Sequence, residues 1–397
     1  MGNIVCCWEL GGYLGHISRF LPLANVLEEK GHHVDYILRD LSRAHLLIKN
    51  KDANIYQAPV WLLKAVGLPK TPVNFAEILQ IYGYLDETGV NGLVSGWMNL
   101  FKKMKPDLAL MDYAPSALIA ARILGIKSAS FGSGFFVPPL QHPTPCLRPW
   151  EKVTEDRLLM SDNLVLKVIN KILQKYDAQK LNALYELYDV DENFLATIPE
   201  LDHYKNRKAK YWGEISQNNS VQSPVWKNNG EKKVFAYIKP ESKMFNVILE
   251  QLAKTNFDII LFAPNLPSKV RKQYADSTIS FSNKPLDIEK VAKECDFGLC
   301  HAGHDTLLNI LIYGKPVLIF PTQLEQYILS KRVEESGAGL SLIEGSTQEQ
   351  VQQALNEIAT NKNLAISAEK ISKDYANQFQ TDPLTQIVSR CEEIMSK

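Results

Sequence analysis

One stretch of the sequence reads Phe297-Gly298-Leu299-Cys300-His301-Ala302-Gly303-His304-Asp305-Thr306. Its apolar first half is typical of a buried strand, and a small polar turn leads directly into a helical pattern that continues to Tyr313. The start of a helix presents backbone N–H groups without partners and the positive end of the helix dipole. The stretch therefore predicts a strand–turn–helix junction that can bind an anion such as phosphate.

A second apolar run, Pro316–Phe320, follows this helix and predicts another strand. Soon after it come a carboxylate and a carboxamide, Glu325 and Gln326. Carboxylate and amide groups form good hydrogen bonds with sugar hydroxyls. A phosphate-binding turn followed by an acid–amide pair is what a nucleotide-sugar donor requires.

Short apolar runs alternate with helical patterns in two series along the chain, which is typical of parallel sheets covered by helices on both faces. The first series contains the strand patterns Ile4–Trp8, Val34–Leu38, Asn54–Gln57, Leu108–Asp112 and Lys127–Phe131. The second contains Val234–Ile238, Asp258–Phe262, Thr278–Phe281, Phe297–Cys300, Pro316–Phe320 and Gly339–Leu342. We therefore expect an α/β protein with two doubly wound, Rossmann-like domains that face a central cleft.

The polar segment 214–232, which proline and glycine interrupt, predicts a linker between these domains. We expect an acceptor-binding domain at 1–213, a donor-binding domain at 233–378, and a helix at 379–397 that returns to the N-terminal domain. The segments 60–105 and 135–205 depart from the strand–helix rhythm and are rich in aromatic residues. They either line an apolar pocket or simply pack over the sheet.

The composition bounds the class of protein. A chain of 397 residues is long enough for two domains, and a formal net charge of zero does not favour a nucleic-acid-binding surface. No apolar run approaches the ~20 residues that span a bilayer, and the chain opens on a strand pattern rather than on a signal peptide. The six cysteines lack the spacing of a metal site or a disulfide framework. We therefore expect a soluble cytoplasmic protein without a metal; the oligomeric state stays open.

The turn after the first strand, Glu9–His16, contains Gly-x-x-x-Gly and lacks the fingerprint of a dinucleotide site. His16 stands at the mouth of the first helix, where it could be a general base or could merely cap or pack the helix. Asp112 ends a strand, and its carboxylate could accept the second imidazole N–H. The alternative is an ordinary strand-end residue. Asp107 begins the same strand, on the other side of the sheet, and is the weaker candidate.

In the second series, His301 and Thr306 could contact phosphate together with the backbone N–H groups of their turn. The same turn could be a plain helix cap, with Asp305 stabilising the helix start. His301 and His304 also suggest a metal site, but no further pair of ligands accompanies them. Ser242, after the first strand of this series, could touch a phosphate or cap a helix.

The sequence resembles the GT-B glycosyltransferases, namely the nucleotide-sugar-dependent small-molecule transferases of plants, mammals and bacteria. The resemblance rests on Gly15-His16, Leu21–Ala24, Lys30–Val34, Pro106–Asp112, Cys295–Thr306, Gly314–Pro316, Pro321, Glu325-Gln326 and Gly337–Gly339. It is specific around 296–339, good around 15–34, and weak in 60–100 and 135–230. What it implies is an inverting, metal-independent transfer to an acceptor hydroxyl, with His16 as general base and Asp112 as its partner.

The resemblance also implies a donor site. It places the diphosphate at His301, Gly303 and Thr306. It places the sugar at Glu325 and Gln326. It places the nucleobase near Pro285 and Leu286. Together with the other candidates of these turns, the expected donor-binding residues are Ser242, Pro285, Leu286, His301, Gly303, His304, Asp305, Thr306, Glu325 and Gln326.

The sequence departs from the plant proteins at Asn283–Leu286, where they have Trp-x-Pro-Gln. This departure argues against UDP and leaves dTDP or another nucleotide open. The expected donor is a UDP- or dTDP-sugar, which is a co-substrate rather than a bound cofactor. The apolar residues in 60–100 and 135–190 favour an apolar, amphipathic or lipid-like acceptor, and a membrane contact through Trp61–Leu63 stays open. Two other functions stay open: a nucleotide-sugar epimerase on the same scaffold, and an inactive nucleotide-sugar-binding protein.

Overall fold

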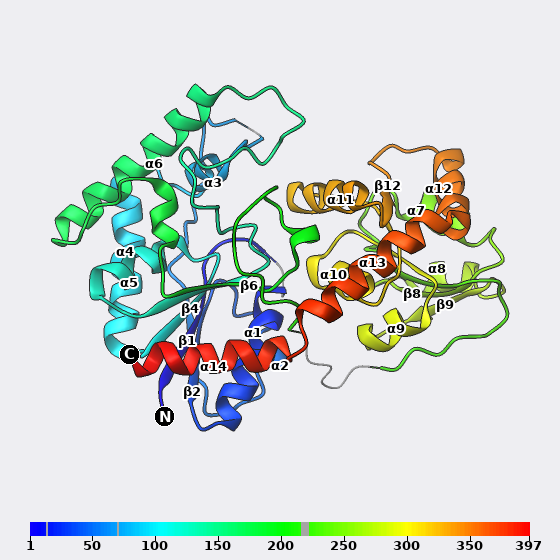
Figure 1. Ribbon diagram of the computed structural model, residues 1–397, viewed down its shortest axis with the longest axis horizontal. Coiled ribbons are helices and arrows are strands. Elements are labelled where there is room, and N and C mark those ends of the chain that lie inside the picture. The colour runs from blue at the N-terminus through cyan, green and yellow to red at the C-terminus, as the bar shows by residue number, and fades with distance from the viewer. Residues whose placement is uncertain (13–14, 70, 216–221) are drawn as a thin grey trace. The chain divides into compact units, whose positions relative to one another are not determined.

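The computed structural model describes residues 1–12, 15–69, 71–215 and 222–397, and it divides into two compact units (Figure 1). Unit 1 comprises Met1–Thr197, Tyr204–Ile215 and Thr381–Lys397; unit 2 comprises Ile198–His203 and Ser216–Gln380. The short segment Ile198–His203, which we expected in the N-terminal domain, is thus part of unit 2. The middle of the expected linker, 216–221, lies outside the described residues.

Unit 1 is built on a six-stranded parallel sheet with the order β3-β2-β1-β4-β5-β6. Its strands are β1 (Asn3–Trp8), β2 (His33–Leu38), β3 (Ile55–Gln57), β4 (Leu108–Asp112), β5 (Ser128–Gly132) and β6 (Glu192–Leu195). The first five coincide with the predicted strands to within a residue. We missed β6, because it is a short edge strand whose first two residues are only partly buried and polar.

Several helices of unit 1 have recognisable start or stop signals. The helices of this unit are α1 (Gly15–Glu29), α2 (Ala44–Leu47), α3 (Phe75–Ile81), α4 (Glu87–Met104), α5 (Pro115–Leu124), α6 (Glu155–Lys175), α14 (Pro383–Ser396) and the 3-10 helix η1 (Leu184–Tyr188). α4 begins after Asp86, whose side chain accepts from the Gly89 N–H. α5 begins with Pro115 and ends at Gly125, which has φ 66°.

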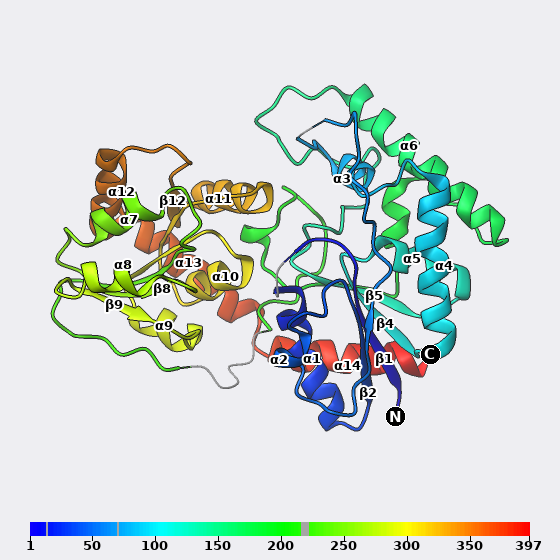
Figure 2. The same ribbon diagram turned by 180° about the vertical axis from the view of Figure 1, so that it is seen from behind.

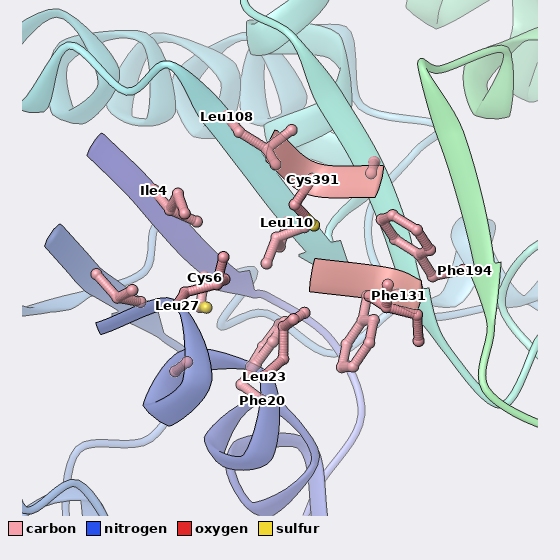
Figure 3. Packing of buried hydrophobic residues seen from close by; sticks show 14 of the residues in the cluster. Ile4, Cys6, Phe20, Leu23, Leu27, Leu108, Leu110, Phe131, Phe194 and Cys391 are labelled. Carbon is pink, nitrogen blue, oxygen red and sulfur yellow. The ribbon is translucent and has the colours of Figure 1, made fainter. Parts of the chain in front are cut away.

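One core cluster of unit 1 is formed mainly by the sheet, α1 and α14. Figure 3 shows Cys6 of β1, Leu110 of β4 and Phe131 of β5 facing Leu23 of α1 and Cys391 of α14. α14 packs beside α1, as both views show (Figures 1 and 2). All six cysteines are free thiols, and five of them are buried, so they serve as small apolar residues.

Unit 2 has a second six-stranded parallel sheet, with the order β12-β11-β10-β7-β8-β9. Its strands are β7 (Lys233–Tyr237), β8 (Asp258–Phe262), β9 (Ile279–Ser282), β10 (Phe297–Cys300), β11 (Val317–Ile319) and β12 (Gly339–Ser341). Its helices are the 3-10 helix η2 (Pro199–Leu201), α7 (Phe245–Leu252), α8 (Ser268–Gln273), α9 (Ile288–Glu294), α10 (His304–Ile312), α11 (Leu324–Ser336), α12 (Gln348–Thr360) and α13 (Lys362–Gln378). All six strands were predicted.

In each sheet the strand order reverses next to the first strand of the unit. The reversal lies between β1 and β4 in unit 1, and between β7 and β10 in unit 2. Ligands of doubly wound sheets bind at the carboxyl ends of the strands at such a switch point. The doubly wound fold that we predicted is confirmed in both units, and each unit has one position where a ligand is expected. Within the described ranges, no helix is long and apolar enough to cross a membrane.

Candidate active site

The structure brings His16 and Asp112 together at the switch point of unit 1. Trp8 pairs with Asp112 in the register of β1 and β4, so the helix that follows β1 starts beside the end of β4. His16 Nδ1 lies 2.8 Å from Asp112 Oδ2. A carboxylate only accepts, so Nδ1–H is the donor and Nε2 keeps the lone pair that can take a proton.

Three further residues, which the sequence did not single out, fix this pair. Trp8 stacks on the His16 ring with the centroids 5.0 Å apart. The Arg19 guanidinium lies 3.8 Å from Asp112 Oδ2. Gly11 has φ +83°, and a Cβ built there would lie 2.7 Å from His16 Nε2. Glycine at this position is therefore required both by the backbone and by the space that the imidazole needs.

Three aromatic rings, those of Phe136, Tyr113 and Tyr82, pack against one another and form an aromatic wall that begins beside the His16 ring. The ring of Phe136 lies 6.4 Å from that of His16 and stacks on Tyr113. Tyr82 meets Tyr113 edge to face at 6.1 Å. Tyr82 and Phe136 come from the two segments that we described as an apolar pocket or simple packing. Phe136 therefore places apolar surface close to the imidazole, and Tyr82 packs behind it through Tyr113.

Glu9, directly after β1, is a buried carboxyl close to this site. Its Oε2 accepts from the Ser116 N–H at 2.8 Å, and its backbone oxygen accepts from Arg39 Nη1 at 2.9 Å. Burial raises the pKa of Glu9 to about 8, because the charged form loses its hydration. The side chain is therefore a neutral acid at neutral pH.

We expect Glu9→Gln to change the pH dependence of stability. The pKa of Glu9 in the folded protein is about 8 and that of an unfolded glutamate is far lower. The stability due to the bound proton is thus complete at low pH and declines as pH rises, until it is lost above pH 8. Between the pKa of the unfolded chain and that of the folded protein, the free energy of unfolding falls by roughly 1.4 kcal/mol per pH unit. Urea denaturation from pH 5 to 9 should show this slope in the wild type and in Glu29→Gln, an exposed control, but not in Glu9→Gln.

On unit 2, the predicted junction is present: β10 ends at Cys300 and α10 starts at His304. The His301 side chain differs from the expectation. Its Nδ1 lies 2.9 Å from the oxygen of Phe320, and its Nε2 accepts from the Lys239 N–H at 2.8 Å. Burial lowers the pKa of His301, which keeps the ring neutral with one donor and one acceptor. Both nitrogens thus bond to the main chain, so His301 ties the strand ends together instead of offering a nitrogen to phosphate.

The remaining residues of the turn leave its outer side open. Gly303 is exposed, and a Cβ built there would meet nothing within 4 Å. His304 is buried, and its Nδ1 lies 3.2 Å from the carboxylate of Asp305, which is half exposed. Thr306 lies in the first turn of α10, whose N–H groups have no carbonyl four residues earlier in the helix. This first turn has the form that an anion site needs.

Glu325 and Gln326 both lie in the first turn of α11, after β11. The Thr322 N–H and hydroxyl each donate to Gln326 Oε1 at 2.9 Å. Gln326 is buried, whereas the Glu325 side chain is 24% exposed. The two bonds from Thr322 hold the amide oxygen of Gln326. Neither of them uses its amide nitrogen, which is the group that can donate to a ligand.

Ser242, Pro285 and Leu286 have local roles in the structure. Ser242 Oγ accepts from the Met244 N–H at 3.3 Å, within the turn before α7. Pro285 and Leu286 form a short bridge with Gln222, whose N–H donates to the Pro285 oxygen at 3.3 Å. A small cavity lined in part by Ser242 lies at the carboxyl edge of this sheet. A cavity of about 470 Å³ in unit 1 lies near the amino end of β5, away from His16.

Comparison with known proteins finds similarity to glycosyltransferases. Residues 243–382 match the model of the glycosyltransferase family 28 C-terminal domain. Human 2-hydroxyacylsphingosine 1-beta-galactosyltransferase is 22% identical over 91% of this chain and 74% of its own length. A PGL/p-HBAD biosynthesis glycosyltransferase of Mycobacterium tuberculosis is 21% identical over 72% of this chain and 70% of its own.

Solved structures share the fold over the whole chain. The glycosyltransferase VinC, crystallised in complex with DTDP, has a TM-score of 0.72 at 14% identity and covers 99% of both chains. The spinosyn rhamnosyltransferase SpnG, complexed with spinosyn aglycone, has a TM-score of 0.68 at 14% identity and covers 98% of this chain and 99% of its own. The two doubly wound units thus have the GT-B fold of these solved glycosyltransferases, and residues 243–382 match a glycosyltransferase domain.

Proposed function

We propose that the protein is an inverting glycosyltransferase that moves a sugar from a nucleoside-diphosphate sugar to a hydroxyl of an apolar or amphipathic acceptor. The observation that carries this proposal is the bond between His16 and Asp112, at the carboxyl edge of the sheet of unit 1. It orients the imidazole so that Nε2 can accept a proton.

In the proposed reaction, the acceptor O–H donates to His16 Nε2. The oxygen attacks the anomeric carbon from the face opposite the diphosphate, and the bond from that carbon to the diphosphate breaks. The proton passes to Nε2, and the Asp112 carboxylate stabilises the imidazolium that forms. The charge that develops on the diphosphate is stabilised by the first turn of α10, with Gly303 and Thr306.

The donor residues divide into three groups. Thr306 and the N–H groups after Gly303 bind the diphosphate, with His301 as the residue that holds the turn. Glu325 and the amino end of Gln326 bind sugar hydroxyls. Pro285 and Leu286 lie near the nucleobase, which is that of UDP or dTDP.

Glu325→Ala should weaken binding of the nucleotide sugar by roughly 10–100-fold, the worth of one or two hydrogen bonds to a charged group. The nucleoside diphosphate alone should bind nearly as it does to the wild type, because Glu325 is assigned to the sugar. Calorimetric titration with UDP, dTDP and their glucose esters measures both affinities. Glu357→Ala, which removes an exposed carboxylate on α12, is the matched control. Loss of nucleotide binding with the sugar preference intact would overturn the assignment.

The aromatic wall beside His16 supports an acceptor with an apolar part. The human relative is named for a 2-hydroxyacylsphingosine, and SpnG was solved with an aglycone. We propose an acceptor of comparable character, with a hydroxyl on an apolar or lipid-like body. We further propose that the enzyme works in the cytoplasm, where its six free thiols stay reduced.

We expect the activity to survive EDTA. In the described part of the chain, no three His, Cys, Asp or Glu side chains gather so that they could hold a metal ion. Stabilisation of the diphosphate is assigned instead to the start of a helix. Turnover should therefore be the same with EDTA and with added magnesium or manganese. Complete loss with EDTA, reversed by either metal, would contradict this account.

Incubation with the donor alone distinguishes this proposal from its alternatives. An epimerase would convert the sugar of the donor without any acceptor, and an inactive binding protein would bind the donor without turnover. The transferase should release nucleoside diphosphate at an appreciable rate only when a hydroxyl acceptor is present. A phenol and a long-chain alcohol serve as test acceptors.

A further inference from the structure

The segment Ile198–His203 follows β6 of unit 1 but belongs to unit 2. Ile198 and Leu201 are buried in a core cluster of unit 2. Arg332 of α11 donates from Nε to the oxygen of Asp202 at 3.0 Å, and from Nη2 to the oxygen of Pro199 at 3.3 Å. Apolar burial and two hydrogen bonds from a cation therefore fix this segment on α11.

His203 ends this segment, and its side chain is fully buried. Its Nε2 lies 3.7 Å from Glu325 Oε1. Its ring stacks on the ring of His304, at the start of α10, with the centroids 6.4 Å apart and the planes at 25°. The imidazole thus stands between the start of α10 and the carboxylate that we assign to the sugar.

A glutamate side chain has several rotatable bonds, and recognition of a hydroxyl requires its oxygens to be held in one place. The Glu325 side chain is 24% exposed, so most of its surface faces other groups of the protein. His203 Nε2 lies beside this carboxylate, and the stacking against His304 sets the plane of the imidazole. Burying the polar nitrogens of an imidazole costs free energy, whereas burying an apolar side chain at this position would not.

We propose that His203 is a positioning residue of the donor site: it holds the Glu325 carboxylate in the orientation that accepts hydrogen bonds from the sugar. The segment Ile198–His203 then completes the sugar end of the site. This inference rests on the proposed function, because it takes Glu325 as the sugar-binding acid. It adds a residue outside the matched family domain at 243–382.

The test compares two affinities in each variant, that for the nucleoside diphosphate and that for its glucose ester. The probes are UDP and UDP-glucose, or dTDP and dTDP-glucose, whichever pair the wild type binds more tightly. His203→Phe keeps a flat ring and removes its polar atoms, and it should reduce the preference for the glucose ester about tenfold with the affinity for the diphosphate unchanged. His203→Gln, which keeps a polar group, should recover part of the preference. Glu200→Gln, on the same segment, should behave as the wild type.

The double variant His203→Phe/Glu325→Ala separates this inference from the proposed function. If His203 acts through Glu325, its replacement should have no further effect once Glu325 is alanine. A purely structural role would instead lower both affinities together with the melting temperature. If Glu325→Ala alone leaves the sugar preference intact, the proposed donor site is wrong. If Glu325→Ala reduces the preference but both His203 variants keep it, this inference alone is overturned.

Discussion

His16→Ala should lower kcat by roughly 10²–10⁴-fold, the usual worth of a general base. The imidazole is the group whose Nε2 is left to take the acceptor proton, because Nδ1 is bonded to Asp112. Donor affinity should change little, since the residues that we propose for the donor lie on unit 2. The measurements are kcat with the test acceptors and the Kd of the donor, with folding checked by melting temperature.

Two companion variants make this prediction sharper. Asp112→Asn should also slow turnover, but less than His16→Ala, because it weakens only the support of the imidazolium. His45→Ala removes an exposed histidine on α2 of the same unit and should leave kcat unchanged. A folded His16→Ala protein that turns over at the wild-type rate would rule out the mechanism and leave the fold untouched.

Removal of Thr381–Lys397 should prevent stable folding of unit 1. α14 buries four aliphatic side chains in the core of this unit: Leu384, Ile387, Val388 and Ile394. At about 1.5–3 kcal/mol each, they contribute roughly 6–12 kcal/mol. This amount is comparable with the whole free energy of unfolding of a typical domain, about 5–15 kcal/mol.

A point variant tests the same contact more gently. Ile387 is fully buried, and Ile387→Ala should lower the free energy of unfolding by about 2–5 kcal/mol. Ser389→Ala, at an exposed position of the same helix, should change it by no more than about 0.5 kcal/mol. Urea denaturation followed by circular dichroism measures both. A truncated protein whose unit 1 unfolds like that of the wild type would show that α14 is dispensable for this core.

The sheets could be predicted because each central strand is a short apolar run with its own turn signals. β6 could not, since an edge strand is only half buried and Glu192 and Asn193 break its apolar pattern. The pair of His16 and Asp112 could be predicted for a topological reason: residues at the carboxyl ends of neighbouring parallel strands lie close together. Gly11 belongs to the Gly-x-x-x-Gly turn after the first strand, but its contact with the imidazole depends on backbone angles that the sequence does not reveal.

On unit 2, the position of His301 could be predicted and its hydrogen bonds could not. Both of its partners are main-chain atoms of other turns, at Lys239 and Phe320. Every residue has such atoms, so the sequence does not indicate which of them a side chain will contact. His203 was missed for a similar reason. Its neighbour Glu325 is far away along the chain, and the intervening segment gives no periodic signal that would place the two together.

The position of α14 has a consequence for the order in which the protein can form during its synthesis. β1 and α14 share one core, and a Cβ built on Gly2 would lie 2.8 Å from Met395 Sδ. Translation therefore produces most of unit 1 first, but the helix that completes its core comes only after all of unit 2. While the ribosome makes unit 2, the apolar surface that α14 will cover has no native cover from its own chain. Unit 2 is thus able to finish folding before unit 1, although unit 1 is begun first.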